Sequence, residues 1–231
     1  MHLLVFAGKH IEEELRAKFG PTHEYTFWDV PADEVEYNEE QRQYFREALK
    51  VADVVFFIQF IEAGYYFLLE PGKFVVFQEA TSMQLFASSG NWPTFGFCGL
   101  PTLLNRRLLE VSLYHEADRE KLAETCAALG TDYRVVADRV GLVTPRVICQ
   151  IINEACFTVQ EGTATIQDVD LGMRLGTSYP RGPFAWANAI GVERVYAVLE
   201  AMWHDTHDER YKVCPLLKRQ ALRGEPFQTM D

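Results

Sequence analysis

The chain has 231 residues, of which 48% are apolar, a proportion typical of a globular protein with its own hydrophobic core. It carries 33 acidic and 22 basic residues, a formal charge of −11, which argues against binding to nucleic acid or to anionic lipid surfaces. The five cysteines are widely spaced, and no apolar stretch approaches the ~20 residues of a transmembrane helix. We therefore expect a soluble, cytoplasmic protein with free thiols.

The first half of the chain alternates short apolar stretches with polar helical stretches. Apolar stretches of strand length lie at residues 3–6, 25–30, 53–58, 74–77, 94–97 and 133–136. Helices are expected from about Ile11, over residues 41–50, and over ADREKLAETCAALG, where Gly130 is a typical helix end. Strands that are apolar along their whole length and separated by helices indicate a parallel sheet covered on both faces. The sequence thus predicts a reduced Rossmann-like α/β domain over residues 1–137.

From about Thr144 the pattern becomes helical. In VICQIINEACFTVQEG the apolar residues fall on one broad helix face: Val147, Ile148, Ile151, Ile152, Ala155 and Val159. Thr165 and Asp168 form a capping box that opens the next helix, and VERVYAVLEAMW is amphipathic in the same way. Between these two helices, the run from Pro180 to Pro183 predicts a rigid corner. We expect an all-α domain over residues 138–231.

The helical half contains an ordered set of motifs. They are Asp138-x-x-Gly141, Asn153-Glu154-Ala155, Glu161-Gly162, Asp168-x-Asp170, Tyr179-Pro180-x-Gly182-Pro183-Phe184, Arg210-Tyr211 and Pro215-Leu216-Leu217. In this order they resemble the C-terminal domain of the 3-hydroxyacyl-CoA dehydrogenase family. The resemblance implies an NAD-dependent oxidoreductase of fatty acid metabolism. It also implies a homodimer formed through the helical domain, which closes one side of an acyl-CoA cleft.

The first half departs from this family at the cofactor turn. Family members follow their first strand with Gly-x-Gly-x-x-Gly, whose glycines let the backbone and a helix N-terminus approach the pyrophosphate of NAD. Here FAGKHIEEEL supplies only Gly8. Glu12, Glu13 and Glu14 place three carboxylates in the first helical turns, where they suit the helix dipole without a bound anion. The acidic residue that follows the second strand in the family has a candidate in Asp29.

The family's catalytic positions are altered as well. In the family a His-Phe-Phe-Asn-Pro segment carries the general base, whereas this chain has FCGLP, with Phe97 at the histidine position and Leu100 at the asparagine position. The linker-helix asparagine of the family falls at Pro145. Ser82 matches a serine that contacts the substrate hydroxyl, and Glu110 matches the glutamate that orients the histidine if one residue is inserted. Ser82 and Glu110 are therefore the candidate catalytic residues.

Histidines elsewhere in the chain offer weaker candidates. His204 and His207 have a spacing that suits a metal site completed by Asp205 or Asp208, but the pattern fixes no third ligand, so we expect no metal. His115 is a candidate for the missing base, but it lies far along the chain from the FCGLP segment and fits a surface turn.

Two functional hypotheses remain. In the first, the protein is a divergent or catalytically inactive 3-hydroxyacyl-CoA dehydrogenase-like protein that binds an acyl-CoA-like ligand. In the second, it is an active NAD-dependent oxidoreductase that acts on a small 3-hydroxyacyl substrate with help from Ser82 and Glu110. Ser82 also fits a loop or helix-cap hydroxyl, and Glu110 also fits a solvent-facing position. Residue chemistry favours the first hypothesis, because the base and most of the cofactor motif are missing.

Overall fold

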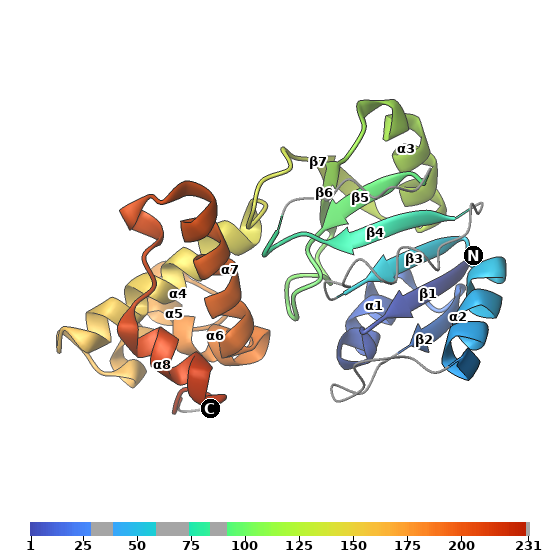
Figure 1. Ribbon diagram of the computed structural model, residues 1–231. Coiled ribbons are helices and arrows are strands. Elements are labelled where there is room, and N and C mark those ends of the chain that lie inside the picture. The colour runs from blue at the N-terminus through green and yellow to red at the C-terminus, as the bar shows by residue number, and fades with distance from the viewer. Residues whose placement is uncertain (29–38, 59–73, 84–91, 230–231) are drawn as a thin grey trace. The chain divides into compact units, whose positions relative to one another are not determined.

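The computed structural model describes residues 1–28, 39–58, 74–83 and 92–229 (Figure 1). The chain forms two compact units. The α/β unit is made of Met1–Ala80, Gln84–Gly99 and Leu104–Asp138. The helical unit is made of Thr81–Met83, Leu100–Leu103 and Arg139–Asp231. Two short segments from the first half of the sequence therefore belong to the helical unit.

A seven-stranded sheet forms the centre of the α/β unit, in the order β2-β1-β3-β4-β5-β6-β7. The strands are β1 (His2–Phe6), β2 (Glu24–Trp28), β3 (Val54–Phe57), β4 (Val75–Glu79), β5 (Thr94–Phe97), β6 (Leu108–Leu113) and β7 (Asp132–Val135). Neighbouring strands are parallel except for the antiparallel pair β5 and β6. Because β1 lies between β2 and β3, the sheet reverses its strand order there, as in a Rossmann-like fold. The predicted fold class is confirmed.

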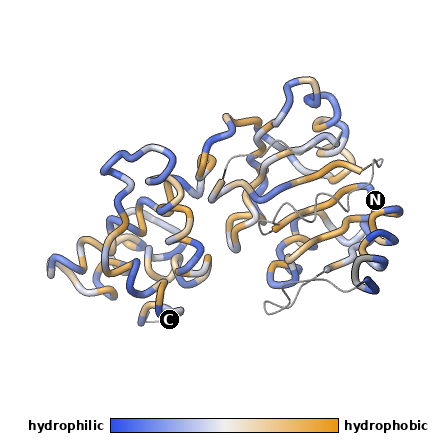
Figure 2. The backbone as a smooth tube through the Cα atoms, viewed as in Figure 1, coloured by the Kyte–Doolittle hydropathy of each residue, from blue (hydrophilic) through white to orange (hydrophobic). Residues whose placement is uncertain are grey.

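Helices cover both faces of this sheet. They are α1 (Glu12–Phe19), α2 (Glu39–Val51) and α3 (Arg119–Ala128), with short 3₁₀ turns η1 (Lys9–Ile11) and η3 (Glu116–Asp118) before α1 and α3. Side chains alternate between the two faces along each strand, so Leu3 packs with α1 and α3 while Leu4 packs with α2. Figure 2 shows the central strands as hydrophobic stretches and α2 as a largely hydrophilic helix. The buried strands explain the continuous apolar runs in the sequence.

Strand β6 lies in a segment for which the sequence pattern predicted no strand. Leu109 and Val111 point into the core. Glu110 and Ser112, which alternate with them along the strand, are buried as well. Each of these polar residues has a partner: Ser112 Oγ donates to Asp138 Oδ1 at 3.0 Å, and Glu110 pairs with Arg106. The strand was therefore not recognised from the sequence, because two of its residues are polar and find their partners only in the folded protein.

The helical unit contains α4 (Thr144–Gln160), α5 (Ile166–Thr177), α6 (Pro183–Ile190), α7 (Val192–Thr206), η4 (Glu209–Tyr211) and α8 (Pro215–Arg223). No strand follows β7 in the described part of the chain. The predicted capping box of α5 is present, with both Thr165 and Asp168 accepting the expected hydrogen bonds. Within the residues that the structure describes, no helix has the length and apolar character needed to cross a membrane.

Asn153 explains one of the sequence motifs of the helical unit. This buried residue of α4 donates from Nδ2 to the carbonyl of Lys212 at 2.9 Å, and its Oδ1 accepts from the amide of Cys214 at 2.8 Å. Gln160, two turns further along α4, accepts from the amide of Leu216 at 2.9 Å. Both side chains form hydrogen bonds with backbone groups just before and at the start of α8, which have no partner within a helix or strand. These polar residues therefore hold α8 against α4.

Candidate functional site

The candidate residues are divided between the two units. Gly8, Phe97 and Glu110 belong to the α/β unit, whereas Ser82 and Leu100 belong to the helical unit. No single unit therefore contains the whole candidate set.

The β1–α1 turn is closed by apolar packing around Gly8. A Cβ atom on Gly8 would lie less than 3.0 Å from Cγ1 of both Val5 and Ile58, so glycine is required here by contacts within the chain. With Gly8 taken as the middle glycine of Gly-x-Gly-x-x-Gly, the first and last glycine positions hold Phe6 and Ile11, which are both buried in the hydrophobic core. Close approach of the backbone to a pyrophosphate depends on those glycines. Two of the three positions are therefore filled with large apolar side chains.

Beyond the turn, α1 begins with three carboxylates. The Glu12 carboxylate is paired with the Lys9 ammonium and with Nε of Arg16, which lies 2.9 Å away. The hydrogen bond from Lys9, followed by that from Arg16, holds the pKa of the Glu12 carboxyl below its ordinary value. Together with Glu13 and Glu14, these residues line an open hollow of about 490 Å³. Negative charge at a helix N-terminus is stabilising by itself, so this helix end is satisfied without a ligand.

Phe97 lies at the end of β5, fully buried at 0% exposure. Its ring makes edge contacts with Phe56 and Phe77, with centroids 5.5 and 6.0 Å away. All three belong to the core cluster on the α1 and α3 side of the sheet. Phe97, which the resemblance matches to the family's base, is thus part of the hydrophobic core of the α/β unit.

Glu110 is a buried carboxylate, with only 7% of the residue exposed. The solvent-facing interpretation of Glu110 is therefore wrong. Its Oε1 lies 3.5 Å from Nη2 of Arg106, which is close enough for an ion pair. Side chains alternate between the two faces along a strand, so Glu110 points to the same face of the sheet as Ser112. Phe97 pairs in register with Val111, and its side chain therefore lies on the opposite face.

Two buried polar residues that the sequence pattern did not single out lie on one line of register across β4, β5 and β6. Gln78 pairs in register with Gly96, which pairs in turn with Ser112, and Ser112 donates to Asp138 at 3.0 Å. Gln78 and Ser112 are both buried. A polar residue among apolar ones in a stretch of strand length is the signal that could have identified each of them, since buried polar side chains need specific partners.

Ser82 is exposed in the segment Thr81–Met83 of the helical unit. The buried Thr81 next to it accepts a hydrogen bond at its carbonyl from the amide of Gly141, at 2.7 Å. In the second segment of this unit, Thr102 Oγ1 accepts from Trp186 Nε1 at 3.2 Å. The two segments that follow β4 and β5 are thus fixed to the start of α4 and to α6. Pro145, in the first turn of α4, is buried and supplies no polar side chain.

The histidine candidates have ordinary surroundings. His204 lies 3.9 Å from Glu200, and Asp205 forms an ion pair with Arg139 at 3.1 Å. His115 is exposed beside Tyr114, at the start of η3. Among the described residues, no three His, Cys, Asp or Glu side chains gather in a way that could hold a metal ion.

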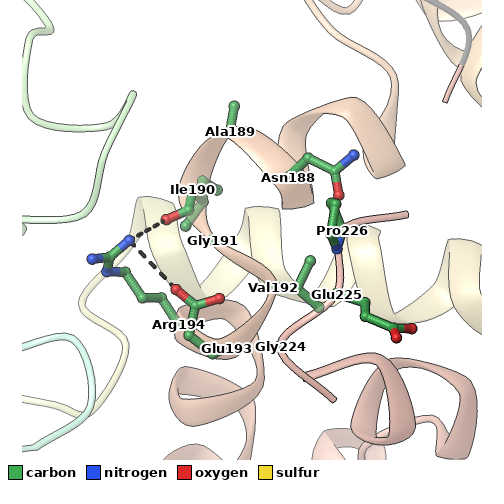
Figure 3. Close-up of a pocket in the computed structure, with 10 residues that line it drawn as sticks. All are labelled: Asn188, Ala189, Ile190, Gly191, Val192, Glu193, Arg194, Gly224, Glu225 and Pro226. Atoms are coloured by element: carbon green, nitrogen blue, oxygen red, sulfur yellow. Dashed lines mark hydrogen bonds and ion pairs between the residues drawn. The ribbon is translucent and has the colours of Figure 1, made fainter. Parts of the chain in front are cut away.

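Figure 3 shows a hollow of about 290 Å³ where α6 meets α7. Arg194 donates from Nη1 to the carbonyl of Ile190 at 3.2 Å and lies 3.5 Å from the Glu193 carboxylate. Gly191 has a φ of 104°, and a Cβ atom there would lie less than 3.0 Å from both Glu193 and Arg194. Arg194 and Glu193 are thus engaged with each other, and Arg194 also with the end of α6.

Comparison with known proteins identifies the helical unit. Residues 141–228 match the family described as 3-hydroxyacyl-CoA dehydrogenase, C-terminal domain. The helical unit is similar to this domain over those residues. The chain is 44% identical over 94 residues to 3-hydroxyadipyl-CoA dehydrogenase of Escherichia coli (strain K12), an alignment that covers 41% of this chain and 20% of that protein. The chain is also 30% identical over 109 residues to 3-hydroxybutyryl-CoA dehydrogenase of Bradyrhizobium diazoefficiens, covering 47% and 37% of the two proteins. The chain thus aligns with well under half of these relatives.

Solved structures of 3-hydroxyacyl-CoA dehydrogenase-like proteins share the fold of the whole chain. FadB2 of M. tuberculosis superimposes with a TM-score of 0.72 over 96% of this chain and 93% of its own, at 19% identity. (S)-3-hydroxybutyryl-CoA dehydrogenase PaaH1 from Ralstonia eutropha gives a TM-score of 0.69 over 96% and 94%, at 18% identity. At these identities the likeness concerns the fold alone.

Dehydrogenases of this family are NAD-dependent. The β1–α1 turn of this chain does not fit the pyrophosphate of that cofactor, because Phe6 and Ile11 occupy glycine positions and three carboxylates follow. Asp29, the candidate contact for the ribose, lies outside the described residues.

Proposed function

We propose that the protein is a catalytically inactive relative of the 3-hydroxyacyl-CoA dehydrogenases that retains a helical unit for ligand binding and dimerisation. The observation that carries this proposal is the fully buried Phe97 at the position of the family's general base. A phenyl ring cannot take a proton, and its place in the core leaves no room there for an added group. Loss of a general base typically costs ~10²–10⁴-fold in rate.

Two further positions support the loss of activity. Leu100 and Pro145, which stand where the family has asparagines, are buried and have no polar side-chain atom. Of the catalytic positions matched by resemblance, Ser82 and Glu110 retain chemistry that suits the reaction. Glu110 lacks a histidine at Phe97 to orient, and it lies on the other face of the sheet from that ring.

A ligand of the acyl-CoA class suits the helical unit better than the α/β unit. Residues 139–231 carry 10 basic and 11 acidic residues, which is close to neutral, so they repel a polyanionic ligand less than the acidic first half of the chain does. Ser82 is exposed beside a segment that is anchored through Thr81 to Gly141. Trp186, which is bonded to Thr102, provides a fluorescent reporter for ligand binding near these segments.

The test is a turnover assay with acetoacetyl-CoA and NADH, together with a fluorescence titration of acetoacetyl-CoA alone. We expect turnover at background, and a change in tryptophan emission that is absent in the Trp186→Phe variant. Turnover near the ~10 s⁻¹ that is typical of enzymes would overturn the proposal and favour an active NAD-dependent oxidoreductase. In that case Glu110→Gln should lower the rate, which would identify Glu110 as a participant.

We also infer that the helical unit forms a homodimer through α5. This helix buries none of its residues within the chain, and it exposes Leu171 at 54% and Leu175 at 75%. Beside it, α4 and α5 enclose an apolar groove of about 400 Å³ whose lining includes Val169 and Met173. Exposed apolar surface of this kind is typical of a protein interface. A second copy of the chain, packed through the same face, would bury it.

A further inference from the structure

The cations of the β1–α1 turn are already engaged within the chain. Besides pairing with Glu12, Arg16 lies over the ring of Tyr25 at 4.5 Å, and Lys9 lies over the ring of Phe27 at 5.3 Å. Both rings belong to β2, the edge strand next to β1. To bind an incoming phosphate, either cation would have to break its ion pair with Glu12. In this geometry it would also lose its cation–π contact.

Negative charge is concentrated in the same half of the chain. Residues 1–138 contain 22 acidic and 12 basic residues, a formal charge of −10, whereas residues 139–231 have 11 acidic and 10 basic residues, a charge of −1. Three of the carboxylates, those of Glu12, Glu13 and Glu14, occupy the first turn of α1. A dinucleotide approaching this turn would meet like charge at the short range where salt screens it least.

We propose that Glu12 is a built-in anion of the β1–α1 turn, and that it closes this α/β unit to the dinucleotide cofactor of its relatives. The carboxylate of Glu12 pairs with Lys9 and Arg16, the cations that could otherwise bind a phosphate. Glu13 and Glu14 add electrostatic repulsion of the phosphate. Phe6 and Ile11 fill the space that glycines leave open in a cofactor turn. The inference concerns cofactor binding alone and does not depend on whether the protein turns over a substrate.

Isothermal titration of NADH and of ADP into the whole protein tests this inference. We expect neither to bind the wild type with a Kd below about 1 mM. In the variant E12Q/E13Q/E14Q, Lys9 and Arg16 lose their ion pairs with Glu12 and the repulsion is removed. The affinity for ADP should then rise about tenfold or more, which corresponds to about 1.4 kcal/mol. NADH should gain less than ADP, because its diphosphate carries less negative charge and is therefore repelled less by the carboxylates that the variant removes.

A matched control separates local from overall charge. The variant E116Q/E120Q/E124Q removes three exposed carboxylates from η3 and α3 of the same unit, so its net charge changes by the same amount. We expect its affinity for ADP to stay within about threefold of the wild type, because none of these three carboxylates lines the hollow at the β1–α1 turn and exposed charges are screened by salt. Equal gains in both triple variants would overturn the role given to Glu12.

Two other results would also overturn the inference. One is binding of NADH to the wild type at micromolar Kd, and the other is an unchanged ADP affinity in the E12Q/E13Q/E14Q variant. If circular dichroism shows that the triple variant is unfolded, the single variant E12Q, which removes the ion pairs of Lys9 and Arg16, gives the same comparison. An inactive protein that binds NADH would refute this inference and leave the proposed loss of turnover intact.

Discussion

Gly182 and Asp170 are packed so closely that a Cβ atom on Gly182 would lie less than 3.0 Å from the carboxyl group of Asp170. That carboxylate accepts hydrogen bonds from the amides of Phe184 and Ala185, at 2.8 and 3.0 Å. It therefore caps the N-terminus of α6, whose own N-cap residue, Gly182, has no side chain to do so. This contact explains why the aspartate and the Pro-Arg-Gly-Pro corner occur at this spacing in the sequence.

Gly182→Ala should lower the free energy of unfolding by about 2–4 kcal/mol, because a methyl group would displace the capping carboxylate. Urea denaturation followed by circular dichroism measures the change. The control is Gly176→Ala in α5, where nothing lies within 4 Å of the added Cβ, and it should be neutral or stabilising by up to ~1 kcal/mol. In the double variant with Asp170→Ala, the losses should be less than additive, because both remove the same cap. A Gly182→Ala protein as stable as the wild type would refute this account of the corner.

Phe97→His should not create dehydrogenase activity. The new imidazole would sit among Phe56 and Phe77 in the hydrophobic core, where it has no substrate to reach. Burial of its polar nitrogens, together with lost ring packing, should cost about 2–4 kcal/mol of stability. The NADH-coupled assay and urea denaturation check the two effects. Phe97→Leu, a control without polar atoms, should be less destabilised than the histidine variant, and turnover well above background in Phe97→His would show that this position reaches a working site.

The proposed homodimer should give a mass near twice the 26.5 kDa of the chain in light scattering coupled to size exclusion. The variant L171D/L175D should be monomeric, because two charges would be placed in an apolar interface. Leu222→Asp on α8 is the matched control: it also charges an exposed leucine, which is 71% accessible, and should leave the dimer intact. A single wild-type peak at the monomer mass, at micromolar concentration, would rule the dimer out.

The buried thiols predict a loss of stability at alkaline pH. Burial raises the pKa of Cys126 and of Cys149 from 9.0 to about 12. The unfolded chain therefore releases these protons at lower pH than the folded one, so the stability that they contribute is complete below pH 9 and is lost as the pH rises toward 12. The loss amounts to at most about 1.4 kcal/mol for each thiol and pH unit.

Urea midpoints measured at pH 7.5 and pH 10 check this prediction. Cys149→Ala should be less stable than the wild type at pH 7.5, because it leaves a small cavity, but should lose less stability between the two values. An equal pH dependence in the two proteins would show that Cys149 does not contribute to the alkaline loss. Because all five cysteines are buried, a thiol reagent should react with the folded protein only slowly.

The sequence by itself determined the elements whose residues repeat with a helical or strand period. The apolar runs of β1, β3, β4 and β5 and the amphipathic faces of α4 and α7 were predicted, since each depends on residues close together in the chain. The capping box of α5 was predicted for the same reason, because Thr165 and Asp168 are only three residues apart. The residue types also predicted, through the resemblance, that the family's base and most of its cofactor glycines are missing, and this stays a prediction.

Only the tertiary structure decided what depends on partners distant in sequence. Strand β6 was missed because Glu110 and Ser112 are polar, and their burial becomes favourable only with Arg106 and Asp138 beside them. The assignment of residues 81–83 and 100–103 to the helical unit rests on contacts such as that of Thr102 with Trp186, 84 positions away. Local periodicity encodes where a segment is apolar, but the hydrogen bonds that compensate a buried polar group form only once distant segments meet.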